Sequence, residues 1–233
     1  MKKVKIIAHR GASFHAPENT IASAKLGWDH QADAVEIDIH LSADKKIIVM
    51  HDSNTKRTTG EDLKIADTPS DKLRTLDAGN WKSESYKGEK VPFLSEILNA
   101  IPKGKQLVIE IKSNKELVPI LKEEIEKSGK LKQCIIISFD FDALVEAKKA
   151  LPKIPSYYLS SKIKAEEIAD WSTRLKEAKV DGLNLNWSSI TPELAQQCIK
   201  YNIPLLAWTI DDPEVAKKLI ALGVTGVTTN KPL

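Results

Sequence analysis

Ala34-Val-Glu-Ile-Asp-Ile-His40 is the segment from which the fold of this chain can be read most directly. The run is apolar and rich in β-branched residues, which favours a buried strand. Residues two apart on a strand point to the same face, so Glu36 and Asp38 should project side by side. Two carboxylates about 4 Å apart repel by about 4 kcal/mol at an effective dielectric constant of about 20. The pair therefore indicates either a bound cation or one protonated carboxyl group.

Outward from this segment, short apolar runs alternate with helical patterns. The strand candidates are 4–8, 34–40, 47–50, 107–112, 134–139, 155–159, 181–186, 204–209 and 224–228. The helix candidates are 20–31, 94–101, 115–128, 141–150, 164–179, 191–202 and 212–222. Such alternation predicts an α/β fold with a parallel sheet.

The linker 41–46 is too short for a parallel crossover, which needs about a dozen residues. The second and third strand candidates should therefore pair as a hairpin, which leaves eight strands in parallel order. We predict a TIM-type (β/α)8 barrel. An open doubly wound sheet is the alternative, but the sequence lacks a Gly-x-Gly-x-x-Gly fingerprint to support it.

Residues 53–92 interrupt the alternation with a polar, turn-rich segment that is too long for an ordinary βα loop. The segment follows the third strand at the end where barrel loops build active sites. We expect one catalytic barrel domain over 1–233, with 53–92 as a small inserted subdomain after the third strand that caps the active site.

Composition excludes several classes of protein. The 35 basic and 32 acidic residues nearly balance at a net charge of +3, and the lysines are scattered, so no nucleic-acid partner is expected. No apolar run approaches the roughly 20 residues of a membrane span, so no stable membrane insertion is expected. The apolar segment after Met1-Lys2-Lys3 is too short for a signal peptide, which favours a cytoplasmic protein; a periplasmic or secreted one stays open if a signal was removed. Cys134 and Cys198 should be packed free thiols. The oligomeric state stays open.

Chemically capable side chains gather at the carboxyl ends of the first four strand candidates, where barrel enzymes place their active sites. Taken singly, His9 could be a satisfied core histidine, and Glu110 with Lys112 a structural ion pair. Buried charge at this density is nevertheless costly without a ligand. The set consists of His9, Arg10, Glu36, Asp38, His51, Glu110 and Lys112.

The residue types indicate the chemistry. Three carboxylates without a cysteine partner form a hard oxygen site, suited to Mg²⁺ or Ca²⁺ rather than zinc. A divalent cation leaves such a site at −1, and Arg10 with Lys112 returns it to about +1, which suits an anion such as a phosphodiester. Two imidazoles could serve as general base and general acid. These types therefore point to metal-assisted cleavage of a phosphate ester.

The same residues lie in motifs that run through the whole chain in a fixed order. The motifs are His9-Arg-Gly11, Ala16-Pro-Glu-Asn-Thr20, Val35-Glu-Ile-Asp38, Val49-Met-His-Asp52, Arg57-Thr-Thr-Gly60, Leu76-Asp-Ala-Gly79, Val91-Pro92, Glu110-Ile-Lys112 and Ala207-Trp-Thr209. With them the chain resembles the glycerophosphodiester phosphodiesterase family of the PLC-like phosphodiesterase superfamily. The resemblance implies a TIM-type barrel with a small insertion after the third strand and a divalent metal. It also implies hydrolysis of glycerophosphodiesters, as small-molecule substrates, to glycerol 3-phosphate and an alcohol.

By motif, the resemblance also implies roles for individual residues. His9 and His51 would be the general acid and base, and Arg10 and Lys112 would contact the phosphate. Trp208 would line the wall for the glycerol or alcohol part. A mechanism of the family has the adjacent glycerol hydroxyl attack phosphorus, and water then opens the cyclic phosphate. The implied metal ligands are Glu36, Asp38 and Glu110.

Two positions depart from the family pattern. Asp211 stands where the family often has Asn, and Asn230 stands where it often has Asp. Because both should lie on late loops at the pocket rim, we expect them to affect substrate preference more than catalysis. Phe139 and Trp187 also end strand candidates and could widen an apolar wall of the pocket, but as lone aromatics they are more often expected to pack into the core.

Two other functions remain as alternatives. A phospholipase D- or C-like enzyme acting on lysolipids or inositol lipids would need an apolar rim or a docking helix, and 53–92 is too polar to supply one. A non-catalytic phosphodiester-binding protein would not need both His9 and His51.

Overall fold

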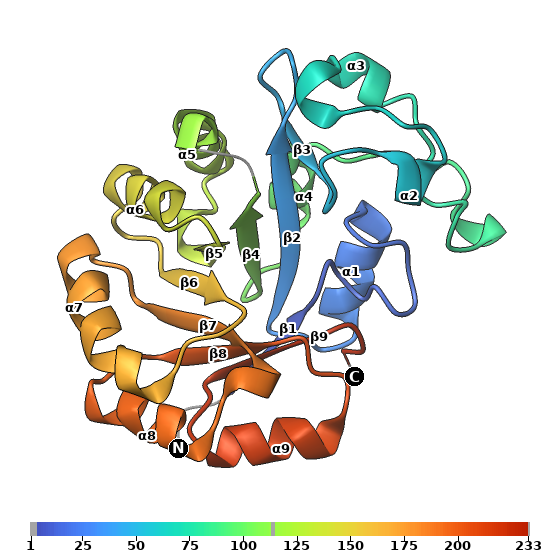
Figure 1. The fold of residues 1–233 in the computed structure, drawn as a ribbon. Helices are drawn as coiled ribbons and strands as arrows, with labels where there is room; N and C mark the ends of the chain where they lie inside the picture. Colours follow the sequence, from blue (N-terminus) through green and yellow to red (C-terminus); the bar gives the residue numbers. More distant parts are fainter. Residues whose placement is uncertain (1–3, 113–114, 233) are drawn as a thin grey trace.

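Eight parallel strands close into a barrel in the computed structural model, which describes residues 4–112 and 115–232 (Figure 1). The TIM-type barrel is thereby confirmed, and the open doubly wound sheet is wrong, because β1 pairs with both β2 and β9. Around the ring the strands are β1 (Lys5–Ala8), β2 (Ala34–Leu41), β4 (Gln106–Ile111), β5 (Cys134–Ser138), β6 (Ser156–Ser160), β7 (Gly182–Asn186), β8 (Leu205–Trp208) and β9 (Gly226–Thr229).

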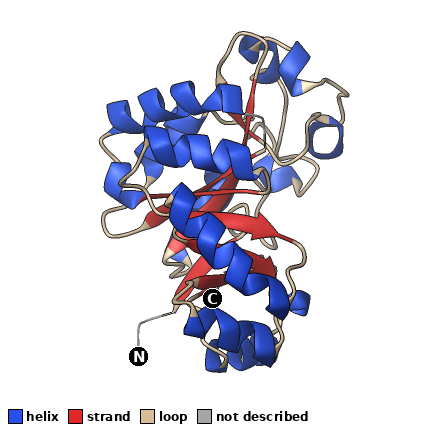
Figure 2. Cartoon of the chain, turned by 60° about the vertical axis from the view of Figure 1, so that its left-hand side comes forward, coloured by secondary structure: helices blue, strands red, loops and turns tan. Residues whose placement is uncertain are grey.

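Helices cover the outside of the barrel, and Figure 2 shows them flanking the strands. Every predicted helix contains one of them, and Thr191 and Asp212 cap the last two through their side chains, as N-cap residues do. The covering helices are α1 (Ile21–Asp29), α4 (Leu94–Ala100), α5 (Val118–Ser128), α6 (Phe141–Ala150), α7 (Ile168–Ala178), α8 (Pro192–Lys200) and α9 (Pro213–Ala221).

The alternation along β2 divides its side chains between two cores. Val35, Ile37 and Ile39 belong to the large apolar cluster between the strands and the helices. Ala34 belongs to the smaller cluster inside the barrel, with Ile7, Val108, Ile135, Ile137, Leu159 and Leu206. Because the side-chain period of a strand is two, Glu36 and Asp38 share the inner face with Ala34.

The short strand β3 (Ile47–Val49) lies outside the ring and runs antiparallel to β2. Its residues pair with Ile39–Leu41 at the end of β2, so the predicted hairpin is confirmed. β1 pairs with β2 only at Ala34 and Val35. One edge of β2 is therefore shared between β1 and β3, and Glu36 to Asp38 lie between them.

Residues 53–92 continue from β3 beside the carboxyl end of β2 (Figure 1). They contain α2 (Lys56–Thr59), α3 (Ser70–Leu73) and the 3-10 turns η1 (Ile65–Asp67) and η2 (Glu84–Tyr86). A separate apolar cluster holds this segment on β3 and comprises Ile48, Met50, Ile65, Leu73, Leu76, Ala78 and Val91.

Cys134 and Cys198 are buried free thiols, as predicted. Burial raises the pKa of Cys134 to about 12 and that of Cys198 to about 11, so both stay protonated at neutral pH. Among the described residues, no helix has both the length and the hydropathy to cross a membrane.

Candidate active site

Three buried carboxylates from neighbouring strands meet at the barrel mouth. Asp38 on β2 is in register with Glu110 on β4, and Glu36 lies two residues before Asp38 on the same face. One oxygen from each of the three groups lies within 4.8 Å of the other two. The residues are only 2%, 1% and 8% exposed for Glu36, Asp38 and Glu110. The side-by-side arrangement expected from the sequence is thus present, with a third acid beside it.

The electrostatics of this triad favour a cation. Burial, followed by the charges of Asp38 and Glu110, raises the pKa of Glu36 well above its usual value. Burial and then Asp38 raise the pKa of Glu110 to about 7. Glu36 Oε1 and Asp38 Oδ1 are buried without a hydrogen-bond partner among the described residues. Unsatisfied hard oxygens at this spacing fit a divalent ion such as Mg²⁺ or Ca²⁺.

Two basic side chains flank the triad. Lys112 Nζ lies 2.9 Å from Glu110 Oε1 and 3.6 Å from Asp38 Oδ1. Arg10 Nε lies 3.5 Å from Asp38 Oδ2, and its backbone N–H donates to Glu36 Oε2 at 2.9 Å. Arg10 follows β1 with a φ of 56°, and the chain turns on through Gly11. A Cβ on Gly11 would come within 2.4 Å of the Ser23 backbone, so this turn requires glycine.

Asn19 completes the open edge of β2. Its side chain donates to Asp38 Oδ2 at 2.8 Å and accepts from the Asp38 backbone N–H at 3.1 Å. The buried amide thus takes the place of a neighbouring strand between β1 and β3. The sequence indicated Asn19 as part of the Ala16-Pro-Glu-Asn-Thr20 motif and as a possible helix start, but its bond to Asp38 was missed.

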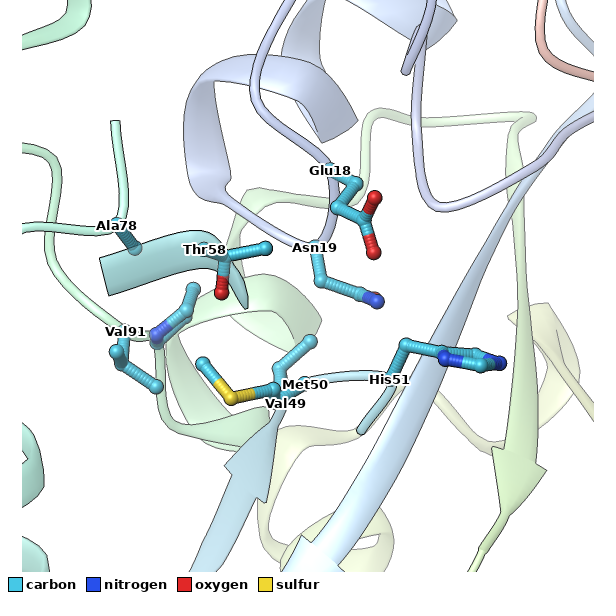
Figure 3. A pocket seen from close by; sticks show the side chains of 9 residues that line it. Glu18, Asn19, Val49, Met50, His51, Thr58, Ala78 and Val91 are labelled. Carbon is cyan, nitrogen blue, oxygen red and sulfur yellow. The ribbon is translucent and has the colours of Figure 1, made fainter. Parts of the chain in front are cut away.

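His51 follows β3 and is oriented by a carboxylate. Its Nδ1 lies 2.7 Å from Asp52 Oδ1, and Arg57 Nε donates to Asp52 Oδ2 at 2.7 Å. The hydrogen bond from Arg57 is the main reason why the pKa of Asp52 falls to about 2. Arg57 also donates to Glu18 with two nitrogens, at 2.7 and 2.9 Å. Figure 3 shows Glu18 and Asn19 above a narrow pocket, with His51 at its edge.

His9 follows β1, and its ring is held by a residue from the end of the chain. Its Nδ1 lies 2.7 Å from Oδ1 of Asn230, on the loop after β9. Burial and the neighbouring Arg10 charge lower the pKa of His9, so the ring is neutral near pH 7. Asn230 therefore contacts a candidate catalytic group, whereas the sequence suggested a position that affects specificity.

A cavity of about 190 Å³ joins these groups to a neutral wall. Trp208 lies in that wall, and the ring of Phe139 meets it edge to face at 5.5 Å. The predicted site residues that line the cavity are His9, Arg10, Glu36, His51, Glu110, Lys112 and Trp208. Asp38 is not among the lining residues, but its carboxylate lies beside those of Glu36 and Glu110.

The core positions expected for Phe139 and Trp187 are wrong. The side chains are 42% and 41% exposed, because each lies just past the last residue of its strand, where the chain leaves the barrel. Asn184, a buried residue of β7 that also lines the cavity, was missed by the sequence interpretation. Its position inside an apolar strand, Gly182–Asn186, was the available signal.

Solved structures with the same fold and similar sequences include phosphodiesterases. The solved structure of an Oleispira antarctica phosphodiesterase, in complex with the product sn-glycerol-3-phosphate, matches with a TM-score of 0.85 at 34% identity. The match covers 98% of this chain and 93% of that one. A glycerophosphodiester phosphodiesterase structure from Thermotoga maritima matches with a TM-score of 0.83 at 27% identity, covering 99% and 96% of the two chains.

Sequence relatives agree with the structural ones. A glycerophosphodiester phosphodiesterase of Caldanaerobacter subterraneus subsp. tengcongensis is 34% identical over 99% of this chain and 95% of its own length. Another from Bacillus subtilis is 31% identical over 99% of this chain and 84% of its own length. The sequence profile of the Glycerophosphoryl diester phosphodiesterase family matches residues 9–233. Fold, sequence and the residues at the barrel mouth lead to one conclusion: the chain belongs to the glycerophosphoryl diester phosphodiesterase family.

Proposed function

We propose that this protein hydrolyses glycerophosphodiesters to glycerol 3-phosphate and an alcohol, with the help of a bound Mg²⁺ or Ca²⁺ ion. The observation that carries the proposal is the buried triad with unsatisfied oxygens, two members of which, Glu36 and Glu110, line one cavity with two histidines. The Oleispira antarctica relative in complex with sn-glycerol-3-phosphate supports the same product.

Glu36, Asp38 and Glu110 would hold the ion. Their oxygens are close enough to share it. Burial, followed by the charges of neighbouring carboxylates, raises the pKa values of Glu36 and Glu110, and a bound cation would compensate that negative charge. When bound, a divalent cation supplies Lewis-acid stabilisation of charge on the phosphoryl oxygens.

Arg10 and Lys112 would bind the phosphate. Both now form ion pairs with the triad, and a cation on the carboxylates weakens those pairs by competing for the same oxygens. Three acids, a divalent ion and two basic side chains leave a charge of +1 facing the phosphodiester anion. The site would therefore attract the substrate and be neutralised by it.

His9 and His51 would act as general base and general acid. In the first step one histidine takes the proton of the glycerol hydroxyl next to the phosphoester, and that oxygen attacks phosphorus. The other histidine gives a proton to the departing alcohol, which leaves a cyclic phosphate on the glycerol. Water then opens the ring while the two histidines exchange roles, which restores their protonation states.

The neutral wall would receive the organic parts of the substrate. Trp208 and Phe139 offer ring faces and edges to the carbon chains of the glycerol or alcohol part. Within the one domain, residues 53–92 would cap the site: Arg57 binds Glu18, and Lys82 Nζ donates to the Ser13 carbonyl oxygen at 2.8 Å.

Exposed Phe139 gives a second candidate some support, because an aromatic side chain in the cavity wall could receive an acyl chain. That candidate is a phospholipase D- or C-like activity on lysolipids. Lysophosphatidylcholine and glycerophosphocholine at equal concentration separate the two, because only the second function requires the acyl group.

The deciding experiment measures glycerol 3-phosphate released from glycerophosphocholine or glycerophosphoethanolamine. Enzyme stripped with EDTA should release it about a thousandfold more slowly, and either Mg²⁺ or Ca²⁺ should restore the release. Full turnover by the stripped enzyme would contradict the metal requirement, and the absence of turnover under every metal condition would contradict the function.

A further inference from the structure

A chain of hydrogen bonds approaches His9 from the loops after β8 and β9. His9 Nδ1 lies 2.7 Å from Asn230 Oδ1. Asn230 in turn donates to both oxygens of Asp211, from Nδ2 to Oδ2 at 2.7 Å and from its backbone N–H to Oδ1 at 2.8 Å. A candidate catalytic ring is thus tied through an amide to a carboxylate.

The carboxylate fixes which way the amide points. An ionised carboxylate only accepts hydrogen bonds, so the NH₂ group of Asn230 must face Asp211 and its oxygen must face His9. Ser13 agrees with this orientation, because its hydroxyl donates to the same Asn230 Oδ1 at 3.0 Å. The orientation therefore rests on partners on both sides of the amide.

Asp211 is well placed to stay ionised. Partial burial acts to raise its pKa, but hydrogen bonds from Asn230 and from the Thr229 hydroxyl outweigh burial and hold the pKa below its usual value. Asp211 therefore remains an acceptor at neutral pH, and the amide stays locked.

We propose that Asp211 and Asn230 are positioning residues that fix the tautomer of His9, so that Nδ1 carries the hydrogen and Nε2 accepts the proton in catalysis. The amide oxygen can only accept, so Nδ1 must donate to it, and the neutral ring keeps its lone pair on Nε2. This inference rests on the proposed function, in which His9 transfers a proton. It assigns the general base to His9 and leaves the general acid to His51.

The two departures from the family pattern, Asp211 and Asn230, can be explained together. Compared with the family pattern, the acid is at position 211 instead of 230 and the amide is at position 230 instead of 211. In this protein the two side chains form a hydrogen bond with each other. Either exchange alone would place two acids or two amides together. Restoring the function of the pair should therefore require changes at both positions, which a comparison of single and double variants tests.

Asp211→Asn should release the amide of Asn230, which can then turn its NH₂ group toward His9. That group favours the tautomer with hydrogen on Nε2, so kcat should fall by about tenfold to a hundredfold while KM changes by less than about threefold. The double variant Asp211→Asn with Asn230→Asp places an acceptor against Nδ1 again, and kcat should recover to within about threefold of wild type.

Asp212→Asn is the matched control, because it removes a neighbouring charge and keeps a side chain able to cap α9. It should leave kcat unchanged. Nitrogen-15 spectra report the tautomer directly, and with five histidines in the chain the His9 signals can be assigned by their loss in His9→Gln. Wild type should show hydrogen on Nδ1, and Asp211→Asn should show it on Nε2.

Unchanged kcat and an unchanged His9 spectrum in Asp211→Asn would overturn the proposal, as would a double variant no better than the single one. The spectra also separate this inference from the function. If wild type turned over no glycerophosphodiester yet showed the Nδ1–H ring, the function would fail while the tautomer assignment stood.

Discussion

The cavity at the barrel mouth has two unlike walls. The wall from β1 to β4 contributes His9, Arg10, Glu36, His51, Glu110 and Lys112. The wall from β5 to β9 contributes Ile137, Phe139, Leu159, Asn184, Trp208, Thr209 and Thr228, none of them charged. A reaction at phosphorus needs charge and proton transfer, whereas recognition of an alcohol needs shape and apolar surface. We therefore expect chemistry and selectivity to depend on different halves of one barrel, so substitutions in the two walls should affect different kinetic constants.

The largest effect is expected when the cation is removed from the charged wall. Chelation with EDTA should lower the rate about a thousandfold, because Lewis-acid stabilisation contributes several kcal/mol to the transition state. Glu36→Gln should lower the affinity for Mg²⁺ as well, which titration of the rate against metal concentration measures. A rate that survives both changes would show that the charged wall works without an ion.

Within the charged wall, the roles of the two histidines can be distinguished by changing the leaving group of the substrate. His51→Ala should lower kcat about a hundredfold on glycerophosphocholine, since the choline alkoxide needs a proton. With a glycerophosphodiester of p-nitrophenol, which leaves without one, the loss should be less than about tenfold. His9→Gln should reduce both rates equally. The reverse pattern would assign the acid to His9.

Stability should also depend on the charged wall when the metal is absent. The pKa of Glu110 is raised from 4.5 to about 7, so between those values the folded state holds a proton that the unfolded state has lost. This contribution is complete below about pH 4.5 and disappears as the pH rises through about 7. EDTA-treated protein should therefore melt roughly 5 °C lower at pH 8 than at pH 5.5, and Mg²⁺ should remove most of the difference.

Glu110→Gln is the control for the melting experiment, because the amide does not titrate. Its metal-free melting temperature should change less between the two pH values than that of wild type. Equal changes in both proteins would assign the pH dependence to other groups.

The smallest effect is expected on the neutral wall. Trp208→Ala should raise KM by about threefold to tenfold, because a partly exposed ring contributes about 1 kcal/mol of contact, while kcat should change little. A panel of glycerophosphodiesters with different alcohols should show the change in selectivity. A large fall in kcat with constant KM would contradict the division between the walls.

Local periodicity allowed the charged wall to be predicted. The alternation in 34–40 placed Glu36 and Asp38 on one face, and the short linker 41–46 identified the β2–β3 hairpin, because both depend on neighbouring residues alone. The bond from His9 to Asn230 joins residues 221 positions apart and exists only because β9 closes the ring against β1. No local pattern contains that contact.

The bonds between the Asn19 amide and Asp38 could not be predicted for a related reason. The amide replaces a strand only where β1 has ended and β3 has not begun, which is a property of the assembled sheet. Exposure of Phe139 and Trp187 likewise depends on where each strand ends, and strand boundaries are the least certain part of any pattern.

The position of β3 determines which part of the inserted segment of this enzyme could be exchanged. The chain leaves the barrel through β3 and returns beside it, since Val49 N–H donates to the Pro92 carbonyl oxygen at 2.9 Å and Ile48 bridges Phe93. Exit and return lie side by side, so the part of the segment that follows His51, Asp52 and Arg57 can be exchanged for a shorter or longer one without changing the strand order of the sheet. β3 itself has to stay, because without it the edge of β2 would be bare and open to pairing with another copy.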